Sequence, residues 1–207
     1  MGRSTKEIAH GYDIFGNIAL IKFDRKAKAK EKKIFAQKFL KKHSSVKTIL
    51  EKSERIKGRL RTPKTKFIAG EKTKGVLYKE NGCEFRFNIE TCYFSPRLNA
   101  ERKEVASLVK KNENVLVMFG GVAPSAIVIA KLARPKKVVS VELSRACYKY
   151  ALENLRRNKV EDIVEVVQGD VRRVVARLKE KFDRIIMPRP NLKDTFLDAA
   201  FSAVKKN

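Results

Sequence analysis

Apolar and polar residues alternate in two different ways along the chain. From residue 115 onward, short apolar runs alternate with stretches whose apolar residues recur at helical spacing. The apolar runs are 115–119, 138–141, 163–167 and 184–187, and the helical stretches are 124–132, 145–158, 171–179 and 192–204. Strand followed by helix, repeated in this way, predicts an α/β domain with a parallel sheet and right-handed crossovers.

The part of the chain before residue 75 has a different pattern. Strand-like runs at 17–23 and 46–50 flank a stretch, 25–42, in which Ile34, Phe35, Phe39 and Leu40 share one helical side and lysines occupy the other. The following basic stretch, 57–66, is interrupted by glycine and proline and is expected to be extended. This region is therefore predicted to be a small basic α+β domain.

A hairpin is predicted between these two regions. The residues 75–80 and 83–89 flank Asn81 and Gly82, a pair that strongly favours a two-residue hairpin turn. We therefore expect three parts: a basic domain at 1–74, a hairpin and helix start at 75–104, and the α/β domain at 105–207.

The charge of the chain changes the picture most. Its 48 Lys and Arg residues exceed its 23 Asp and Glu residues, for a net charge of +25. Residues 1–80 hold 23 basic and 8 acidic residues, so this smaller part is the more basic one. A field of this sign attracts polyanions, and nucleic acid is the leading candidate, ahead of an anionic membrane surface. A charge-rich thermophile surface is the alternative, but it would carry both signs in rough balance.

Several classes of protein are disfavoured by the sequence. No apolar run is long enough for a membrane span, and the first residues lack the apolar segment of a signal peptide. Cys83, Cys92 and Cys147 form no CxxC pair, so we expect neither a disulfide framework nor a metal site, and the reducing cytoplasm fits.

Polar residues and glycines follow three successive predicted strands of the α/β domain. Gly120 and Gly121 follow the first strand, Glu142 ends the second, and Asp170 follows the third. Doubly wound folds place a nucleoside-containing cofactor at this edge, with glycines near it and an acid on its ribose. Gly120 and Gly121 alone could equally form a tight turn. A phosphate-binding GxxxxGK[ST] motif is absent from the sequence, which argues against a P-loop nucleotidase.

Four segments, taken in order, resemble the archaeal and eukaryotic tRNA (guanine-37-N1)-methyltransferases. The segment 88–101 contains the FSPR signature of that family, and 11–21 resembles the start of its middle domain. The segment 117–124 resembles the cofactor loop DMFAGVGP, and 184–190 stands where the family has RIIMNLP. The resemblance covers nearly the whole chain. The sister group of wybutosine-pathway aminocarboxypropyl transferases shares the fold and the cofactor loop.

The resemblance implies a Rossmann-like class I methyltransferase domain that uses S-adenosylmethionine and methylates N1 of guanosine 37 in the anticodon loop of tRNA. The basic domain before it is expected to bind RNA. The predicted cofactor-binding residues are Tyr93, Phe94, Met118, Phe119, Gly121, Val122, Glu142, Asp170 and Pro188. For Tyr93 and Phe94, ordinary core packing is the alternative.

The catalytic residues implied by the resemblance are Glu101, Arg97 and Arg61. Guanine N1 carries a proton near neutral pH, so a positioned base must remove it as the methyl group arrives. With Ser95 as N-cap and Pro96 as first helical residue, Arg97 and Glu101 are predicted one turn apart on one helix face. Glu101 is the predicted base and Arg97 would orient it or the cofactor, while an ordinary ion pair between them is the alternative.

Arg61 matches the family arginine that stabilises negative charge on guanine O6, a task that suits a permanently charged guanidinium. A phosphate contact is its alternative role.

The chain also departs from the family pattern. Val117 stands where the family has an acid, Ala123 replaces a glycine, and Pro188 replaces the asparagine of the NLP motif. The proline form resembles an archaeal branch that also methylates a tricyclic wyosine precursor. The family's N-terminal domain and its last strands have no counterpart, so the sheet is predicted to be C-terminally incomplete. We expect a partner chain to cover the open edge beside the fourth strand.

Three other functions remain open from the sequence. The same cofactor could support aminocarboxypropyl transfer, although the spacing from FSPR to Glu101 favours methyl transfer. The chain could be a non-catalytic tRNA-binding remnant, which the altered cofactor loop supports and the retained Glu101, Arg97, Arg61, Glu142 and Asp170 oppose. A basic ribosome-associated protein is a further alternative, which the α/β half disfavours.

Overall fold

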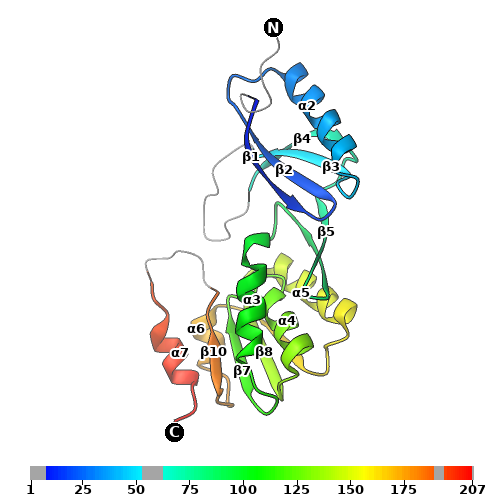
Figure 1. Cartoon of the computed structure of the whole chain (residues 1–207). Coiled ribbons are helices and arrows are strands. Elements are labelled where there is room, and N and C mark those ends of the chain that lie inside the picture. The colour runs from blue at the N-terminus through cyan, green and yellow to red at the C-terminus, as the bar shows by residue number, and fades with distance from the viewer. Residues whose placement is uncertain (1–7, 53–62, 189–193, 207) are drawn as a thin grey trace. The chain divides into compact units, whose positions relative to one another are not determined.

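The computed structural model describes residues 8–52, 63–188 and 194–206 (Figure 1). The chain divides into two compact units, which are considered separately below. The first comprises Met1–Tyr78 and Phe87–Pro96, and the second comprises Lys79–Arg86 and Arg97–Asn207. This division differs from the predicted boundaries because the base of the hairpin belongs to the first unit and its tip to the second.

Within the described residues, the first unit contains a mixed sheet of four strands and a long connecting helix. Its elements are β1 (Ala9–Phe15), β2 (Ile18–Phe23), α2 (Ala29–Lys42), β3 (Thr48–Lys52) and β4 (Thr65–Gly70). The strand order is β1-β2-β3-β4, and only the β2–β3 pair is parallel. Parallel strands need a crossover connection, and α2 supplies it. The predicted strands at 17–23 and 46–50 and the helix between them are thus confirmed.

The helix α2 buries a narrower face than its sequence suggested. Ala36 and Phe39 are buried against the sheet, together with Ile21, Phe23 and other apolar residues. Ile34 was expected on this face, but 45% of its surface is exposed. One residue along a helix turns the side chain by about 100°, so Ile34 lies off the line that joins Phe35 to Phe39.

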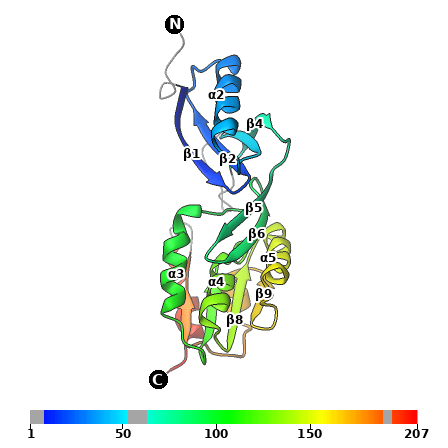
Figure 2. The ribbon, with the colours of Figure 1, turned by 45° about the vertical axis from the view of Figure 1, so that its right-hand side comes forward.

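The hairpin forms as predicted. The strands β5 (Gly75–Glu80) and β6 (Cys83–Asn88) make a two-stranded sheet. Asn81 and Gly82 both have positive φ, at 49° and 71°, as a two-residue turn that matches the twist of the strands requires. Figure 2 shows the hairpin with both of its strands labelled.

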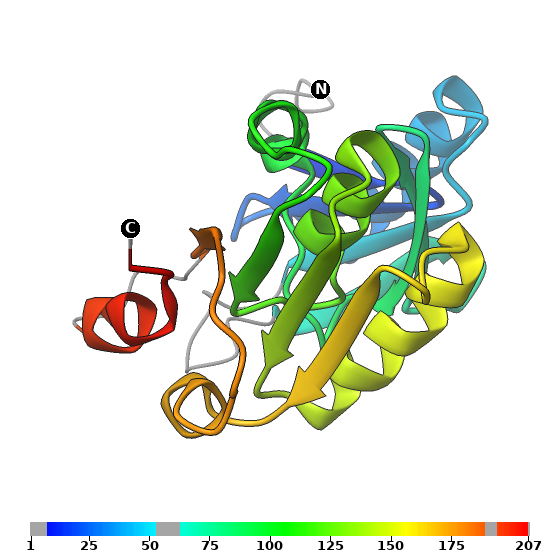
Figure 3. The same ribbon diagram turned by 90° about the horizontal axis from the view of Figure 1, so that it is seen from below.

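The second unit is a parallel sheet covered by helices on both faces. Its elements are η1 (Pro96–Leu98), α3 (Asn99–Ser107), β7 (Asn114–Met118), α4 (Pro124–Ala133), β8 (Lys137–Glu142), α5 (Arg145–Asn158), β9 (Val164–Gln168), α6 (Val171–Val175), β10 (Arg184–Ile186) and α7 (Leu197–Ala203). The strand order is β10-β7-β8-β9, with all pairs parallel. In Figure 3, α4 and α5 lie on one face of the sheet and α6 and α7 on the other. The predicted α/β domain is confirmed.

Two helices differ from their predicted length. α6 ends at Val175 rather than near residue 179, and the chain continues through a turn in which Leu178 N–H reaches the carbonyls of Val174 and Val175. α7 begins at Leu197, and the predicted start near 192 lies outside the described residues. After α7, Val204 pairs with Phe182 in a parallel bridge, so the chain here lies along the side of the sheet that β10 borders. Among the described helices, none has the length and apolar character that crossing a membrane requires.

Candidate active site

The carboxyl ends of the four parallel strands bring the predicted polar positions to one edge of the second unit. Gly120 and Gly121 follow β7, Glu142 ends β8, Asp170 follows β9 and Pro188 follows β10. The strand order reverses direction between β7 and β10, because the chain adds β8 and β9 on one side and β10 on the other. Ligands of doubly wound folds bind in the crevice at this reversal. The topology therefore assigns the candidate site to the loop after β7.

The loop after β7 has an unusual backbone. Phe119, Gly121 and Ala123 have φ values of 61°, 59° and 65°, of which two belong to residues with a Cβ. Such left-handed residues cost energy and concentrate at functional sites. Gly120 N–H donates to Val141 O at 2.8 Å, which holds the loop against β8. A Cβ at Gly120 would lie 2.1 Å from Ser140 Oγ, so only glycine permits this approach.

Glu142 supports the same loop. Its side chain is 8% exposed, with Oε2 accepting from Gly121 N–H at 2.7 Å and Oε1 accepting from Ser144 N–H at 2.6 Å. Burial raises the pKa of Glu142 and outweighs the hydrogen bonds from the backbones of Ser144, Gly121 and Leu143, which lower it. Each carboxylate oxygen can accept more than one hydrogen bond, so Glu142 can also take a ligand hydroxyl.

Asp170 forms the N-cap of α6, with its side chain accepting from Arg172 N–H at 3.1 Å. The guanidinium of Arg172 pairs with Asp194 and Asp198 and lies 4.7 Å from the centre of the Phe196 ring. The Phe196 ring in turn contacts Phe119 edge-on, with centroids 5.0 Å apart. The loop after β7 is therefore joined through Phe196 to the ion pairs that connect α6 with α7.

The helix α3 carries Glu101 in its first turn, where a negative charge is favourable. Figure 1 shows α3 alongside β7, with its start at the end of the sheet where β7 finishes. Both Arg97 and Glu101 are exposed.

The prediction of one α-helix from Pro96 is wrong. Pro96–Leu98 forms a 3₁₀ turn and the N-cap of α3 is Leu98, not Ser95. Since 3₁₀ turns have three residues each and often open a helix, the α-helical spacing of Arg97 and Glu101 does not apply.

The remaining predicted site residues do not all lie exposed at the loop after β7. Met118 and Val122 have no exposed surface, so neither residue reaches a ligand in this conformation. Phe94 is 7% exposed and stacks on Phe87 in the core of the first unit, whereas Tyr93 is 43% exposed. Pro188 is exposed beyond β10. Arg61 lies outside the described residues.

Sequence reasoning missed three buried polar side chains of β8 and α5. Ser140 is fully buried on β8, and its hydroxyl has no hydrogen-bond partner among the described residues. Asn154 and Asn158 are buried on α5 and bond to the backbone of β6. The available signal was the spacing of the two asparagines, which places both on the apolar side of α5 with Ala151 and Leu155.

Two family models together match almost the whole chain. A TRM5/TYW2 methyltransferase domain matches residues 76–207, and a TYW2 N-terminal domain matches residues 3–73.

Three curated relatives bear different activities in their names. The tRNA (guanine(37)-N(1))-methyltransferase Trm5b of Pyrococcus abyssi is 35% identical over 193 residues, which are 93% of this chain and 56% of the relative. The tRNA 4-demethylwyosine(37)-methyltransferase Taw21 of Saccharolobus solfataricus is 31% identical over 99% of this chain and 77% of its own length. A tRNA(Phe) (4-demethylwyosine(37)-C(7)) aminocarboxypropyltransferase of Methanocaldococcus jannaschii is 34% identical over 79% of this chain and 64% of its own length.

Solved structures agree with this grouping. The complex of aTrm5 with tRNALeu superposes with a TM-score of 0.84 and 26% identity, covering 97% of this chain and 58% of that one. The Methanocaldococcus jannaschii Trm5 in complex with adenosine has a TM-score of 0.81 and 26% identity, over 97% and 59% of the two chains. The chain spans about half the length of several of these relatives. The fold, the family models and the identities together show that this chain belongs to the TRM5/TYW2 methyltransferase family.

Proposed function

We propose that this chain binds S-adenosylmethionine at the loop after β7 and transfers its methyl group to N1 of guanosine 37 in tRNA. The observation that carries the proposal is the loop itself, where the Gly121 amide and the Glu142 carboxylate meet at the reversal of a parallel sheet. Relatives with the same fold are named as tRNA (guanine(37)-N(1))-methyltransferases. A solved relative contains adenosine, which is part of the proposed cofactor.

The residues of the loop suit an adenosyl cofactor. Glu142 offers carboxylate oxygens to a ribose diol, and Gly120 lets the loop pack closely on β8 beside that carboxylate. When bound, the cofactor supplies a methyl group on a positively charged sulfur. Glu101 would take the proton of guanine N1 as the methyl group arrives at that nitrogen. Arg61 is proposed to stabilise the negative charge on guanine O6, and Arg97 to orient Glu101 or the cofactor.

The anticodon loop is the proposed target because the reaction concerns base 37, and the strong positive charge supports binding to RNA. Extrusion of the base from its stack would deliver it to Glu101. We further propose that the chain acts in the cytoplasm, where its three cysteines would remain thiols.

A second chain, or a further strand, is proposed to cover the sheet beside β10. The pairing of Val204 with Phe182 supports this, because it already begins a parallel neighbour on that side. Analytical ultracentrifugation of the purified chain tests for the second chain, since a monomer at micromolar concentration would exclude a stable dimer.

Methyl-labelled S-adenosylmethionine and two tRNA transcripts test the central proposal. One transcript carries guanosine at position 37 and the other adenosine. Label on the guanosine transcript alone is expected. No label on either transcript, with tRNA still bound, would contradict the methyltransferase reading and favour a tRNA-binding remnant.

Aminocarboxypropyl transfer is a second candidate. The similarity to a named aminocarboxypropyltransferase and the match of residues 3–73 to a TYW2 N-terminal domain favour it. The mass of the modified nucleoside distinguishes the two reactions, because the transferred groups differ in mass. A tRNA that carries 4-demethylwyosine at position 37 tests both transfers to that base.

A further inference from the structure

Two asparagines of α5 make, with their side-chain amides, the hydrogen bonds to β6 that a neighbouring strand would make. Arg86 N–H donates to Asn154 Oδ1 at 2.7 Å, and Asn154 Nδ2 donates to Arg86 O at 3.1 Å. One helical turn later, Glu84 N–H donates to Asn158 Oδ1 at 2.9 Å, and Asn158 Nδ2 donates to Glu84 O at 2.7 Å. Each side-chain amide thus pairs with both backbone groups of one residue of β6.

Within the described residues, Asn154 makes one contact that Asn158 does not make. Its Nδ2 also donates to the carbonyl of Val122, at 3.2 Å, in the loop after β7. Asn158 Nδ2 instead donates its further bond to Asn154 O within the same helix. Asn154 has no exposed surface, and Val122 is also fully buried. A buried amide that satisfies three backbone groups fixes their relative positions, because breaking any of these bonds leaves a polar group unpaired.

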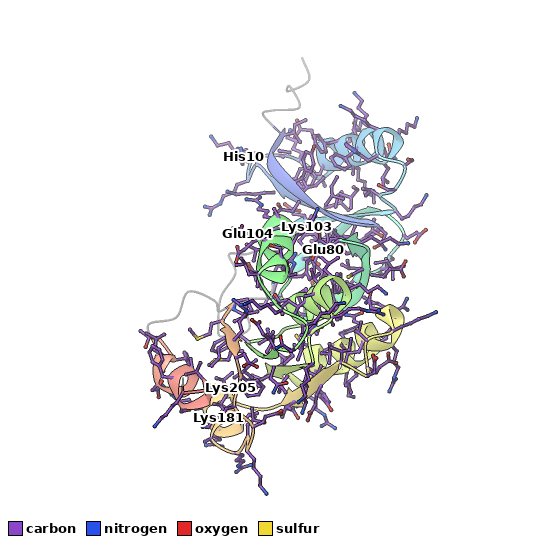
Figure 4. The ribbon with its side chains drawn as sticks, turned by 60° about the horizontal axis from the view of Figure 1, so that its bottom comes forward. His10, Glu80, Lys103, Glu104, Lys181 and Lys205 are labelled. Atoms are coloured by element: carbon purple, nitrogen blue, oxygen red, sulfur yellow. The ribbon has the colours of Figure 1, made fainter. Side chains whose placement is uncertain are left out.

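The other strand of the hairpin holds α3. Glu80 and Arg102 form a bidentate buried ion pair, with Nε to Oε1 at 2.5 Å and Nη2 to Oε2 at 2.6 Å. Asn81 Nδ2 also donates to the carbonyl of Asn99 at 3.1 Å, in the first turn of α3. These contacts lie on both sides of Glu101 in the sequence. In Figure 4, Glu80 lies beside α3, close to the labelled Lys103 and Glu104 of that helix.

We propose that Asn154 is a positioning residue that joins the loop after β7 to the hairpin and, through the Glu80–Arg102 pair, to the helix that carries Glu101. The inference rests on the proposed function, because it concerns the two parts to which cofactor binding and proton removal are assigned. All the contacts on this route lie within the second unit. The hairpin is therefore one physical connection that fixes the distance between the loop and the helix that carries Glu101, in addition to the packing of α3 against α4.

The rate of the reaction depends more steeply on this distance than the stability of the fold does. A misplacement of about 1 Å between reacting groups can cost about 100-fold in rate, while the same shift costs little packing energy. Removal of the Asn154 amide should therefore affect the reaction more than it affects stability. Asn158 provides the matched control, since it bonds equally to β6 without touching the loop.

The test compares Asn154→Ala with Asn158→Ala. Both variants lose two bonds to β6 and should lower the thermal midpoint by similar amounts. Asn154→Ala should also weaken S-adenosylmethionine binding by about tenfold, the order expected for a lost bond that leaves a buried carbonyl unpaired. Its kcat at saturating cofactor should fall by about tenfold or more while the KM for tRNA changes little. Asn158→Ala should keep the cofactor affinity of the parent within about twofold.

Amide hydrogen exchange supplies a measurement that needs neither cofactor nor activity. In Asn154→Ala, exchange should rise in peptides that cover 119–124 and 99–107, and in Asn158→Ala only in the hairpin. If the parent chain transfers no methyl group, the proposed function fails, yet the exchange pattern still decides the positioning role. Equal exchange and equal cofactor affinity in the two variants would overturn the proposal.

Asn154→Asp and Asn158→Asp form a second pair in case an alanine variant does not fold. Each keeps the acceptor for the N–H of β6 and loses the donor, but only Asn154→Asp sets a carboxylate against the Val122 carbonyl. The loop peptide and the cofactor affinity should respond to Asn154→Asp alone. Identical behaviour of the two aspartate variants would contradict the inference.

Discussion

At the scale of single residues, Glu101 and Glu104 offer a direct comparison on α3. Both are exposed glutamates on the same short helix, but only Glu101 lies in the first turn, at the end of the sheet where the loop after β7 begins. Glu101→Gln keeps the size of the side chain and removes its ability to take the N1 proton. Methyl transfer in single turnovers should therefore slow by about 100-fold or more, with tRNA and cofactor affinities unchanged.

Glu104→Gln is the control for this prediction, because it removes the same charge from the same helix one turn away. Its single-turnover rate should match that of the parent. Equal rates for Glu101→Gln and the parent would contradict the assignment of Glu101 as the base.

Glu142 adds a dependence on pH. Burial raises the pKa of its carboxyl above the ordinary 4.5, so between 4.5 and the raised value the folded chain binds more protons than the unfolded chain. The contribution of Glu142 to the free energy of unfolding therefore falls as the pH rises through this window.

Cofactor binding should show the opposite trend, because a ribose hydroxyl donates to the charged carboxylate. Affinity should fall as the pH drops through the raised pKa.

Glu142→Gln should weaken S-adenosylmethionine binding at neutral pH by about tenfold or more, the order of a hydrogen bond to a charged group. The same substitution should remove the acid decline in affinity. Calorimetric titration at several pH values, with parent and variant side by side, measures both effects. A decline of the same size in the variant would mean that another group titrates.

At the scale of elements, the connection from β7 to α4 depends on how closely Gly120 approaches β8. Gly120→Ala would place a Cβ 2.1 Å from Ser140 Oγ, while the next neighbours, at 3.5 Å, are ordinary contacts. The hydroxyl alone therefore opposes the larger residue. Gly120→Ala should lower the free energy of unfolding by about 1–3 kcal/mol and weaken cofactor binding.

Ser140→Ala should rescue Gly120→Ala, because it removes the obstructing oxygen. By itself Ser140→Ala deletes a buried hydroxyl for which the described residues show no partner, so its effect on stability should be neutral or favourable. Chemical denaturation of the two single variants and the double variant measures the coupling. Simple additivity of the two effects would contradict the steric explanation.

An element could be predicted when its own residues form a recognisable pattern in the sequence. The strands β7 and β8 are almost wholly buried and read as apolar runs, and Asn81-Gly82 defines its own turn. By contrast, β1 exposes His10, Gly11 and Tyr12 and was not recognised, because these residues give this edge strand no alternating apolar pattern. The 3₁₀ turn before α3 was also missed, since Pro96 fits the start of either kind of helix.

The residues of the candidate site also divide into those that a local sequence pattern could locate and those that it could not. Positions that follow a strand, such as Gly121 and Glu142, could be located from the sequence, because parallel strands end at one edge. The bonds of Asn154 and Asn158 to β6 could not, because the partners are backbone groups 68 and 74 residues away. These hydrogen bonds can be identified only from the structure, which places the hairpin against α5.

At the scale of the whole molecule, the positive charge is concentrated in the smaller part of the chain. Residues 1–80 carry 23 basic and 8 acidic side chains, and α2 exposes Lys30, Lys33, Lys38 and Lys41 to solvent. If these side chains neutralise phosphates of tRNA, binding releases counterions. The logarithm of the tRNA association constant should then fall linearly with the logarithm of salt concentration, by about 0.7–0.9 for each phosphate contact.

Two double variants, each of which replaces two lysines by glutamine, test whether α2 is responsible for the slope of tRNA affinity against salt concentration. Lys30→Gln with Lys33→Gln should flatten the salt dependence by up to about two contacts. Lys181→Gln with Lys205→Gln removes the same charge before β10 and after α7, where both lysines lie away from the carboxyl edge of the sheet (Figure 4). The second pair should lower affinity only weakly and leave the slope of the parent, because it changes the field without removing a contact. Equal slopes for both double variants would show that tRNA binding depends on net charge alone and would remove α2 from the interface.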